Sequence, residues 1–472
     1  MKAVNPAREL AKFALETRWE DLPPDIVHET KRVLMDSIGC ILGALTMEKG
    51  KKYVALARRY GGPPESSIMG LSDKVSLPTA ALANGELMFT LDYHTIMSGA
   101  HDAPYVLPTI LAVAESTGAS GKDLILSATL GCEISSRLAR AVLRHPIGVQ
   151  AGTPRPAGPQ RNGNAYSNFG AAAGAGKLLK FDQEKMVHAL GLAGHLCMAL
   201  TYGRWGHSET RYMGKYGIPG WQNTGAVMAV LLAEMGYTGD TTVLDTENGF
   251  AFFTGYRDWY PEKILEDIGK TWWYNYRLHY KPYPCCAVFH SELDCFMDVL
   301  EKYNLLPEEI ESVRAYGRAS TEGGLFAAGA PENISSAQFN PRYIFSVAAH
   351  RVRVGPEWHD PETAHDPRIL AFMPKVTCQP HPDYQKQLAK EPLSSIARCD
   401  VTARGKVYTI ERKHRRGTTG TDAALTDDDL IRKFRHNAER VLTQDKIDRA
   451  VQAFMELEKL DNTTQLIREV TL

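Results

Sequence analysis

The four residues Lys281-Pro282-Tyr283-Pro284 mark the point where the pattern of the chain changes. Before them, apolar residues recur at intervals of three and four, as in Leu34, Ile38 and Leu42, which is the period of amphipathic helices. Short β-prone runs follow them, at residues 312–316, 375–378 and 406–410. The sequence therefore predicts a helical part followed by a mixed α/β part.

The end of the chain returns to a helical pattern. Residues 427–460 are amphipathic, and one face carries Leu430, Phe434, Ala438 and Leu442. We therefore predict a mostly α protein in which residues 1–270 are helical, residues 271–410 form a smaller α/β domain and residues 411–472 rejoin the helical part. A chain of 472 residues exceeds the usual size of a single core, so two domains are expected.

A run of small residues, Gly170-Ala-Ala-Ala-Gly-Ala-Gly176, stands out within the helical part. Such a run is stable as a helix only where neighbouring elements pack tightly against its backbone. We expect it to form a central, buried helix.

Composition narrows the class of protein. The 54 Lys+Arg balance 55 Asp+Glu, which leaves no basic field for nucleic-acid binding. No apolar stretch reaches the roughly 18 residues that span a bilayer, and the N-terminus lacks the features of a secretory signal. The eight cysteines contain no CxxC pair. We expect a cytoplasmic protein with reduced thiols that binds neither membranes nor nucleic acid.

Residues 84–108 combine unusual chemistry with an otherwise apolar setting. Asp92, His94, Thr95, His101 and Asp102 fall between two helix-like segments, where a carboxylate and imidazoles can serve as general acid and base. An equally weighted alternative is that Asp92 caps a turn and His101 is a surface histidine. A metal site ranks lowest, because the spacing is not a compact ligand pattern.

Two further places carry cations suited to a carboxylate ligand. Arg204, His207 and Lys215 lie on a segment interrupted by glycines, which let backbone amides approach a ligand. A solvated loop is the alternative there, and for a charge run taken alone it is the favoured one. Lys281 stands beside two prolines that stiffen the backbone, so it is a candidate substrate anchor at the domain boundary.

Several motifs in this order resemble the MmgE/PrpD family, which includes cofactor-independent 2-methylcitrate dehydratases, cis-aconitate decarboxylases and iminodisuccinate epimerases. The likeness covers nearly the whole chain. The motifs that carry it are LMDSIG at 34–39, NG at 84–85, LDY at 91–93, His101 with VLP at 106–108, GASGKDL at 118–124, residues 225–239, KPYPCC at 281–286 and KF at 433–434.

The resemblance implies a large all-helical domain built from both chain ends, a smaller α/β lid domain between them, and a homodimer. It places the active site in the cleft between the two domains. By resemblance, Asp92 and His101 are acid/base candidates, whereas Thr95, Lys215 and Lys281 are ligands of substrate carboxylates. We count Lys215 with the catalytic residues; the substrate-binding set is Thr95, Asn164, Lys281, Arg204 and His207.

This chain departs from the family pattern at informative positions. Asn164 stands where a commonly catalytic histidine is usual, and an amide cannot act as acid or base near neutral pH. Asp102 rather than proline follows His101, and Gln338 stands where a lysine is frequent. These departures mean that the reaction of this chain can differ from that of any one member of the family.

The predicted function is that of a lyase without metal or cofactor, acting on a small di- or tricarboxylate. Proton abstraction next to a carboxylate, followed by loss of water, is the first expectation, and cations stabilise the resulting charge. Epimerisation or decarboxylation of a polycarboxylate is the alternative among enzymes. A non-catalytic dimeric scaffold is the alternative outside them.

Overall fold

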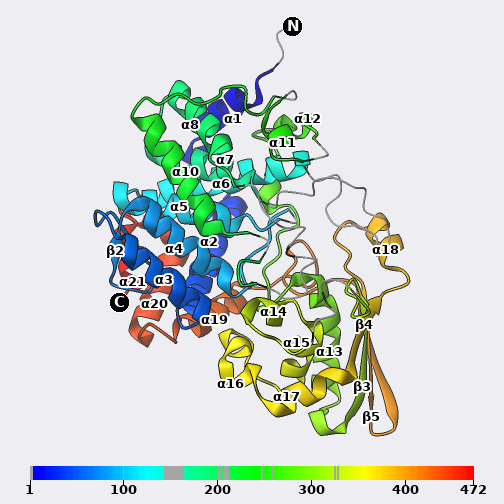
Figure 1. The fold of residues 1–472 in the computed structure, drawn as a ribbon. Coiled ribbons are helices and arrows are strands. Elements are labelled where there is room, and N and C mark those ends of the chain that lie inside the picture. Colours follow the sequence, from blue (N-terminus) through cyan, green and yellow to red (C-terminus); the bar gives the residue numbers. More distant parts are fainter. Residues whose placement is uncertain are drawn as a thin grey trace.

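The computed structural model describes most of the chain, and every structural statement below concerns these described residues: 4–98, 100–142, 164–198, 205, 212–215, 217–245, 248–256, 259–323, 326 and 329–472. Helices from both ends of the chain gather in one part of the molecule, and the main sheet lies at the other (Figure 1).

The helical part contains eleven labelled helices from the first 270 residues and three from the end. The first set is α1 (Pro6–Glu16), α2 (Pro24–Ala44), α3 (Glu48–Tyr60), α4 (Leu77–Thr90), α5 (Ala103–Thr117), α6 (Gly121–Val142), α7 (Ser167–Leu178), α8 (Gln183–His195), α10 (Pro219–Glu234), α11 (Phe250–Phe253) and α12 (Glu262–Leu265). The C-terminal set is α19 (Asp427–Ala438), α20 (Gln444–Met455) and α21 (Thr464–Glu469). A hairpin of β1 (Ser66–Ser67) and β2 (Lys74–Val75) joins α3 to α4.

One hydrophobic core unites the two chain ends. Leu430 and Phe434 of α19 are fully buried in the same core as Leu34 and Ile38 of α2. The predicted tail of 427–460 is thus helical and buried on the expected face, and it consists of two helices and a short 3₁₀ turn.

The small-residue run forms α7 as predicted. A side chain at Gly170 would place its Cβ 2.2 Å from the Gly131 carbonyl oxygen, and one at Gly174 would approach the Ser127 carbonyl oxygen to 2.7 Å. Glycine is required at both positions because α6 and α7 touch through their backbones. This close packing fixes the frame from which the neighbouring helix α5 presents its N-terminal end.

A four-stranded sheet organises the α/β part. Its order is β4 (Val376–Pro380), β3 (Ile310–Gly317), β5 (Ala397–Ala403), β6 (Lys406–Arg412), with β3 parallel to β4 and antiparallel to β5. Three of these strands match the predicted runs, whereas β5 was missed. The helices of this part are α13 (His290–Lys302), α14 (Ile334–Gln338), α15 (Pro341–Ala349), α16 (Pro361–Ala364), α17 (Pro367–Phe372) and α18 (Tyr384–Lys390).

A second hydrophobic core lies between this sheet and the helices α13 and α15. Short 3₁₀ segments complete the structure: η1 (Trp19–Asp21), η2 (Trp273–Asn275), η3 (Ala287–Phe289), η4 (Pro307–Glu309), η6 (Pro356–His359), η7 (Met373–Lys375) and η8 (Leu457–Lys459). The mostly α fold class is confirmed, while the division into domains at 1–270, 271–410 and 411–472 stays a prediction. No helix among the described residues combines the length and apolarity that crossing a membrane demands.

Candidate active site

Asp92 lies between two lysines in a fully buried cluster. Its Oδ2 is 2.9 Å from Lys281 Nζ and its Oδ1 is 3.4 Å from Lys215 Nζ. Each of the three side chains is at most 1% exposed. Two of the predicted lysines therefore converge on one predicted carboxylate, although 189 residues separate Asp92 from Lys281.

The backbone around these residues departs from regular structure. Helix α4 ends at Thr90, and Asp92 follows with φ 51°, while Lys215 has φ 49°. Left-handed backbone at a non-glycine residue costs about 1 to 3 kcal/mol, and such strain concentrates at functional sites. The lysines also bind carbonyl oxygens: Lys215 Nζ donates to Phe89 O at 3.1 Å and Lys281 Nζ to Asp92 O at 2.8 Å.

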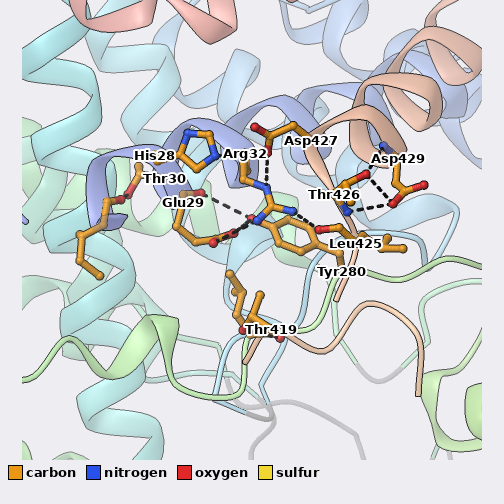
Figure 2. Close-up of polar contacts among 12 residues, drawn as sticks. His28, Glu29, Thr30, Arg32, Tyr280, Thr419, Leu425, Thr426, Asp427 and Asp429 are labelled. Carbon is orange, nitrogen blue, oxygen red and sulfur yellow. Dashed lines mark hydrogen bonds and ion pairs between the residues drawn. The ribbon is translucent and has the colours of Figure 1, made fainter. Parts of the chain in front are cut away.

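The segment that carries Lys281 is fastened to both chain ends. Figure 2 shows Tyr280 donating its hydroxyl to Glu29 of α2, with Arg32 bound to Glu29, Asp427 and the Leu425 carbonyl. The Tyr280 amide donates to the Gly417 carbonyl, and a Cβ at Gly417 would meet the Tyr280 oxygen at 1.8 Å. Lys281 is thus held in place by residues from three distant segments.

His94 and His101 form a pair beside this cluster. His94 Nε2 is 2.8 Å from His101 Nδ1, and the two rings meet edge to face. Burial, with Lys281 adding to it, lowers the pKa of His101 to about 3 and that of His94 well below its usual value. Both imidazoles are therefore neutral across the physiological pH range, and the ring that donates the hydrogen bond between them carries its basic lone pair on its other nitrogen.

The cluster holds more positive than negative charge. Burial would raise the pKa of Asp92, but Lys215 and Lys281 outweigh burial and hold it well below its usual range. Burial lowers the pKa of Lys215 to about 7, and Asp92 limits that shift. One carboxylate cannot neutralise two ammonium groups, so the cluster either releases a proton from Lys215 or receives an anion.

Asp92, His94 and His101 could together offer ligands to a metal ion. One ligand atom from each lies within 4.8 Å of the others. The fold therefore brings these three side chains close together, although their spacing in the sequence is not that of a compact metal-ligand motif. A cation there would face the ammonium groups of Lys215 and Lys281, which already bind both carboxylate oxygens of Asp92. This electrostatic repulsion disfavours a resident metal.

A second buried charge pair lies next to the first. Lys433 Nζ is 2.7 Å from Asp36 Oδ1, and the Thr95 hydroxyl donates to Asp36 Oδ2 at 2.7 Å. Lys433 also donates to the carbonyls of Tyr93 and Lys281. Thr95, predicted as a substrate ligand, is therefore engaged with Asp36 in this structure.

Asn164 lies against a third buried carboxyl group. Its Nδ2 is 3.5 Å from Asp102 Oδ1, which also accepts a hydrogen bond from Ser167 at 3.0 Å. Burial raises the pKa of Asp102 to about 7, and the serine hydrogen bonds limit that rise. The position that departs from the family's histidine thus neighbours a carboxyl group able to carry a proton near neutral pH.

Comparison with known families agrees with the motifs found in the sequence. The family model of the MmgE/PrpD N-terminal domain matches residues 8–261, and the model of the MmgE/PrpD C-terminal domain matches residues 283–457. The chain belongs to the MmgE/PrpD family. The cluster of Asp92 and Lys215 lies within the first match, and Lys281 lies between the two matches.

Several curated relatives in the MmgE/PrpD family are cis-aconitate decarboxylases. The protein from Aspergillus terreus (strain NIH 2624 / FGSC A1156) is 25% identical over 72% of this chain and 70% of its own length. The human protein is 24% identical over 93% of this chain and 89% of its own, and the mouse protein 23% identical over 95% and 89%. The human and mouse matches extend over most of both chains, whereas the Aspergillus terreus match covers about seven tenths of each, and all three have low identity.

The α/β part of this MmgE/PrpD protein adds two residues that the predicted site did not include. Gln338 Nε2 donates to the Thr90 carbonyl at 2.7 Å, two residues before Asp92. His359 Nε2 lies 2.6 Å from the Pro284 carbonyl, and burial lowers the pKa of His359 to about 4. No local motif marks His359, whereas Gln338 was noted only as a departure from the family. Arg204 and His207 lie outside the described residues.

Proposed function

We propose that the protein is a lyase that acts on a small di- or tricarboxylate by proton transfer next to a carboxylate. The observation that carries this proposal is the buried excess of positive charge around Asp92. A substrate carboxylate entering the cluster supplies the missing negative charge and raises the pKa of Lys215 again. Binding and activation of the acid are thereby coupled.

The first reaction we propose is dehydration of a β-hydroxy polycarboxylate. Neutral His101 removes the proton from the carbon next to the carboxylate, in the tautomer that donates its Nδ1–H to His94. Protonated Lys215 gives its proton to the departing hydroxyl, which leaves as water while the C–C double bond forms. Lys281 holds the carboxylate, and Asp92 orients both lysines. Asp92 itself stays ionised, so it is not the acid.

Decarboxylation is the second candidate, because the relatives above are named cis-aconitate decarboxylases. In that reaction the C–C bond to a carboxylate breaks, CO2 leaves, and Lys215 delivers a proton to the carbanion. The same cations would hold the remaining carboxylates. Epimerisation needs proton removal and return only.

Proton NMR in D2O tests the proposal. Purified protein is incubated with citrate, 2-methylcitrate, cis-aconitate or iminodisuccinate, with and without a chelator. An unsaturated product that keeps every carbon of the substrate identifies dehydration, a product one carbon shorter identifies decarboxylation, and deuterium exchange alone identifies epimerisation. Absence of exchange and product with every compound, together with a raised melting temperature, would instead identify a binding scaffold.

Two lysine variants locate the reaction. Lys281→Met is expected to abolish turnover of whichever compound reacts, whereas Lys52→Met, an exposed lysine paired with Glu48 in α3, is expected to leave it unchanged. Circular dichroism shows whether each variant is folded. Equal activity in both variants would contradict the assignment of the site.

We further propose that the α/β part opens for substrate, because the site residues are buried. We also propose that the protein works as a homodimer. Helix α10 supports the dimer: Trp221 and Met228 on one face are 55% and 41% exposed, and Met235 just beyond its end is 80% exposed. An uncovered apolar stripe of this kind is typical of an interface. Light scattering of the native chain and of Trp221→Lys tests it against the monomer mass of 52.3 kDa.

A further inference from the structure

A polar cavity lies at the junction between the two cores. It opens to solvent, and about 600 Å³ of space that includes this open solvent lies within it; its lining does not include Asp92, Lys215 or Lys281. Arg277 and Thr418 line it beside the first core, and Arg318 and Ser394 line it from the α/β part. A ligand in this cavity would therefore touch segments of both parts.

The cavity is rich in guanidinium groups that lack carboxylate partners. Arg277, Arg318 and Arg415 all line it, and none of them forms an ion pair within 4.0 Å among the described residues. Arg277 Nε and Nη1 are buried without a hydrogen-bond partner in the described structure, and Arg277 has φ 58°. Buried guanidinium nitrogens of this kind are costly unless a partner binds them.

The remaining polar groups of the cavity neutralise only part of this charge. Glu292 is the carboxylate in the lining, and its Oε1 accepts the backbone amides of Arg318 and Ala319 at 2.7 and 3.1 Å. Burial raises the pKa of Glu292 to about 7. Ser394 is 4% exposed, and no hydrogen-bond partner of its Oγ is found within the described part of the chain. Two guanidinium nitrogens of Arg277 and the Ser394 hydroxyl are therefore available to donate hydrogen bonds to a ligand.

We propose that this cavity binds a small polyanion bearing carboxylate or phosphate groups, at a site separate from the Asp92 cluster. Planar guanidinium groups bind the oxygens of either group in pairs, so both share the chemistry of recognition. The bound anion joins Arg277 of the first part to Arg318 of the α/β part. Its occupancy therefore stabilises the arrangement of the two parts around the catalytic cluster.

The cavity and the cluster are connected through one short segment. Cys285 and Cys286 come directly after Lys281-Pro282-Tyr283-Pro284, and Ala287 and Val288 line the cavity. Burial raises the pKa of the Cys286 thiol to about 11, and the charges of Asp92, Lys281 and Arg318 also act on it.

Arginine footprinting on the native protein tests the proposal. The chain is treated with phenylglyoxal, with sodium chloride balancing ionic strength, in the absence or presence of inorganic phosphate or tricarballylate, and modified peptides are quantified by mass spectrometry. Modification of Arg277 and Arg318 is expected to slow about tenfold at an anion concentration ten times the Kd, since only unoccupied sites react. Arg314, exposed on β3 outside the cavity, is the internal control.

Two variants separate this site from the proposed active site. Asp92→Asn is expected to keep the protection of Arg277 and Arg318, whereas Arg277→Gln is expected to reduce the anion-induced rise in melting temperature and Arg314→Gln to leave it intact. Protection by phosphate but not tricarballylate, or the reverse, identifies the source of the anion. Equal rates with and without both anions, or protection that disappears in Asp92→Asn, would overturn a separate site.

Discussion

Asp36 and Asp92 are both buried aspartates bound to lysine, yet they differ in charge balance. Asp36 has one lysine partner, Lys433, and a hydroxyl donor, and Lys433 fills its other hydrogen bonds with carbonyls. Asp92 has two lysine partners and neutral histidines beside it. The first arrangement is complete without a ligand, whereas the second is complete only with an additional anion.

Burial alone therefore does not distinguish a structural charge from a functional one. The fully buried pair of Glu133 and Arg137 repeats the balanced arrangement, since Arg137 donates to Glu133 and to several backbone carbonyls. Asp102 completes the series as a buried carboxyl group bound to serines rather than to a cation. Asp102 has no cation partner, Asp36 has one and Asp92 has two, and we expect substitution to have a different effect in each case.

The unbalanced cluster is expected to show the largest effect on catalysis. Asp92→Asn removes the charge that holds both lysines, so Lys215 loses its proton more readily and turnover falls by roughly 10² to 10⁴. Initial rates on the compound that reacts in the NMR assay measure this loss. Retention of more than half of the activity in folded Asp92→Asn protein would show that Asp92 is another structural aspartate.

The balanced pair is expected to affect stability instead. Lys433→Met leaves Asp36 charged and unpaired in the interior, which lowers the free energy of unfolding by about 3 to 5 kcal/mol. Urea denaturation followed by circular dichroism measures the change. The folded fraction should keep kcat within about twofold, and a large fall in kcat at unchanged stability would reverse the contrast with Asp92.

Asp102 is expected to make stability depend on pH. Because its folded pKa is about 7 and its unfolded value is near 3.9, the folded state binds more protons, and stability falls as pH rises between those values. Asp102→Asn removes that dependence, so the variant gains at most about 4 kcal/mol over the native chain at pH 8 and little at pH 4. Melting curves across this range, compared with Asp123→Asn on the surface, test it.

The smallest effect is expected in the pH profile of kcat/KM. Lys215 acts as an acid only when protonated, and its pKa in the free protein is about 7. The ratio should therefore fall about tenfold per pH unit above 7 and stay level between pH 5 and 7, because the pKa of His101 is about 3. A ratio that instead rises above pH 7 would assign Lys215 the role of base.

Local pattern was sufficient for much of the fold. The strands β3, β4 and β6 and the buried helix α7 follow from alternation and from small residues. Strand β5 was missed because its buried positions are Ala397, Cys399, Val401 and Ala403, which are mostly small and give a weak alternation signal.

Local pattern was insufficient for the site. Asp92, His101 and Lys281 were chosen from residue type and from family resemblance, while the contact between Asp92 and the two lysines joins segments far apart in the chain, with Lys281 lying 189 residues from Asp92. The partnership of Asp36 with Lys433 and the position of His359 carry no local signal at all. Thr95 illustrates the limit, since its residue type suits a substrate ligand but its hydroxyl binds Asp36.

The sequence by itself determined the helical character, most strands, the family and the kinds of chemistry available, because these depend on periodicity and residue type along the chain. The tertiary structure decided which charges meet and therefore which carboxylate has two lysines, one or none. The reason is physical: Coulomb energy and desolvation depend on distances and burial in space. Those quantities are set only when Lys215, Lys281 and Asp92 are packed together.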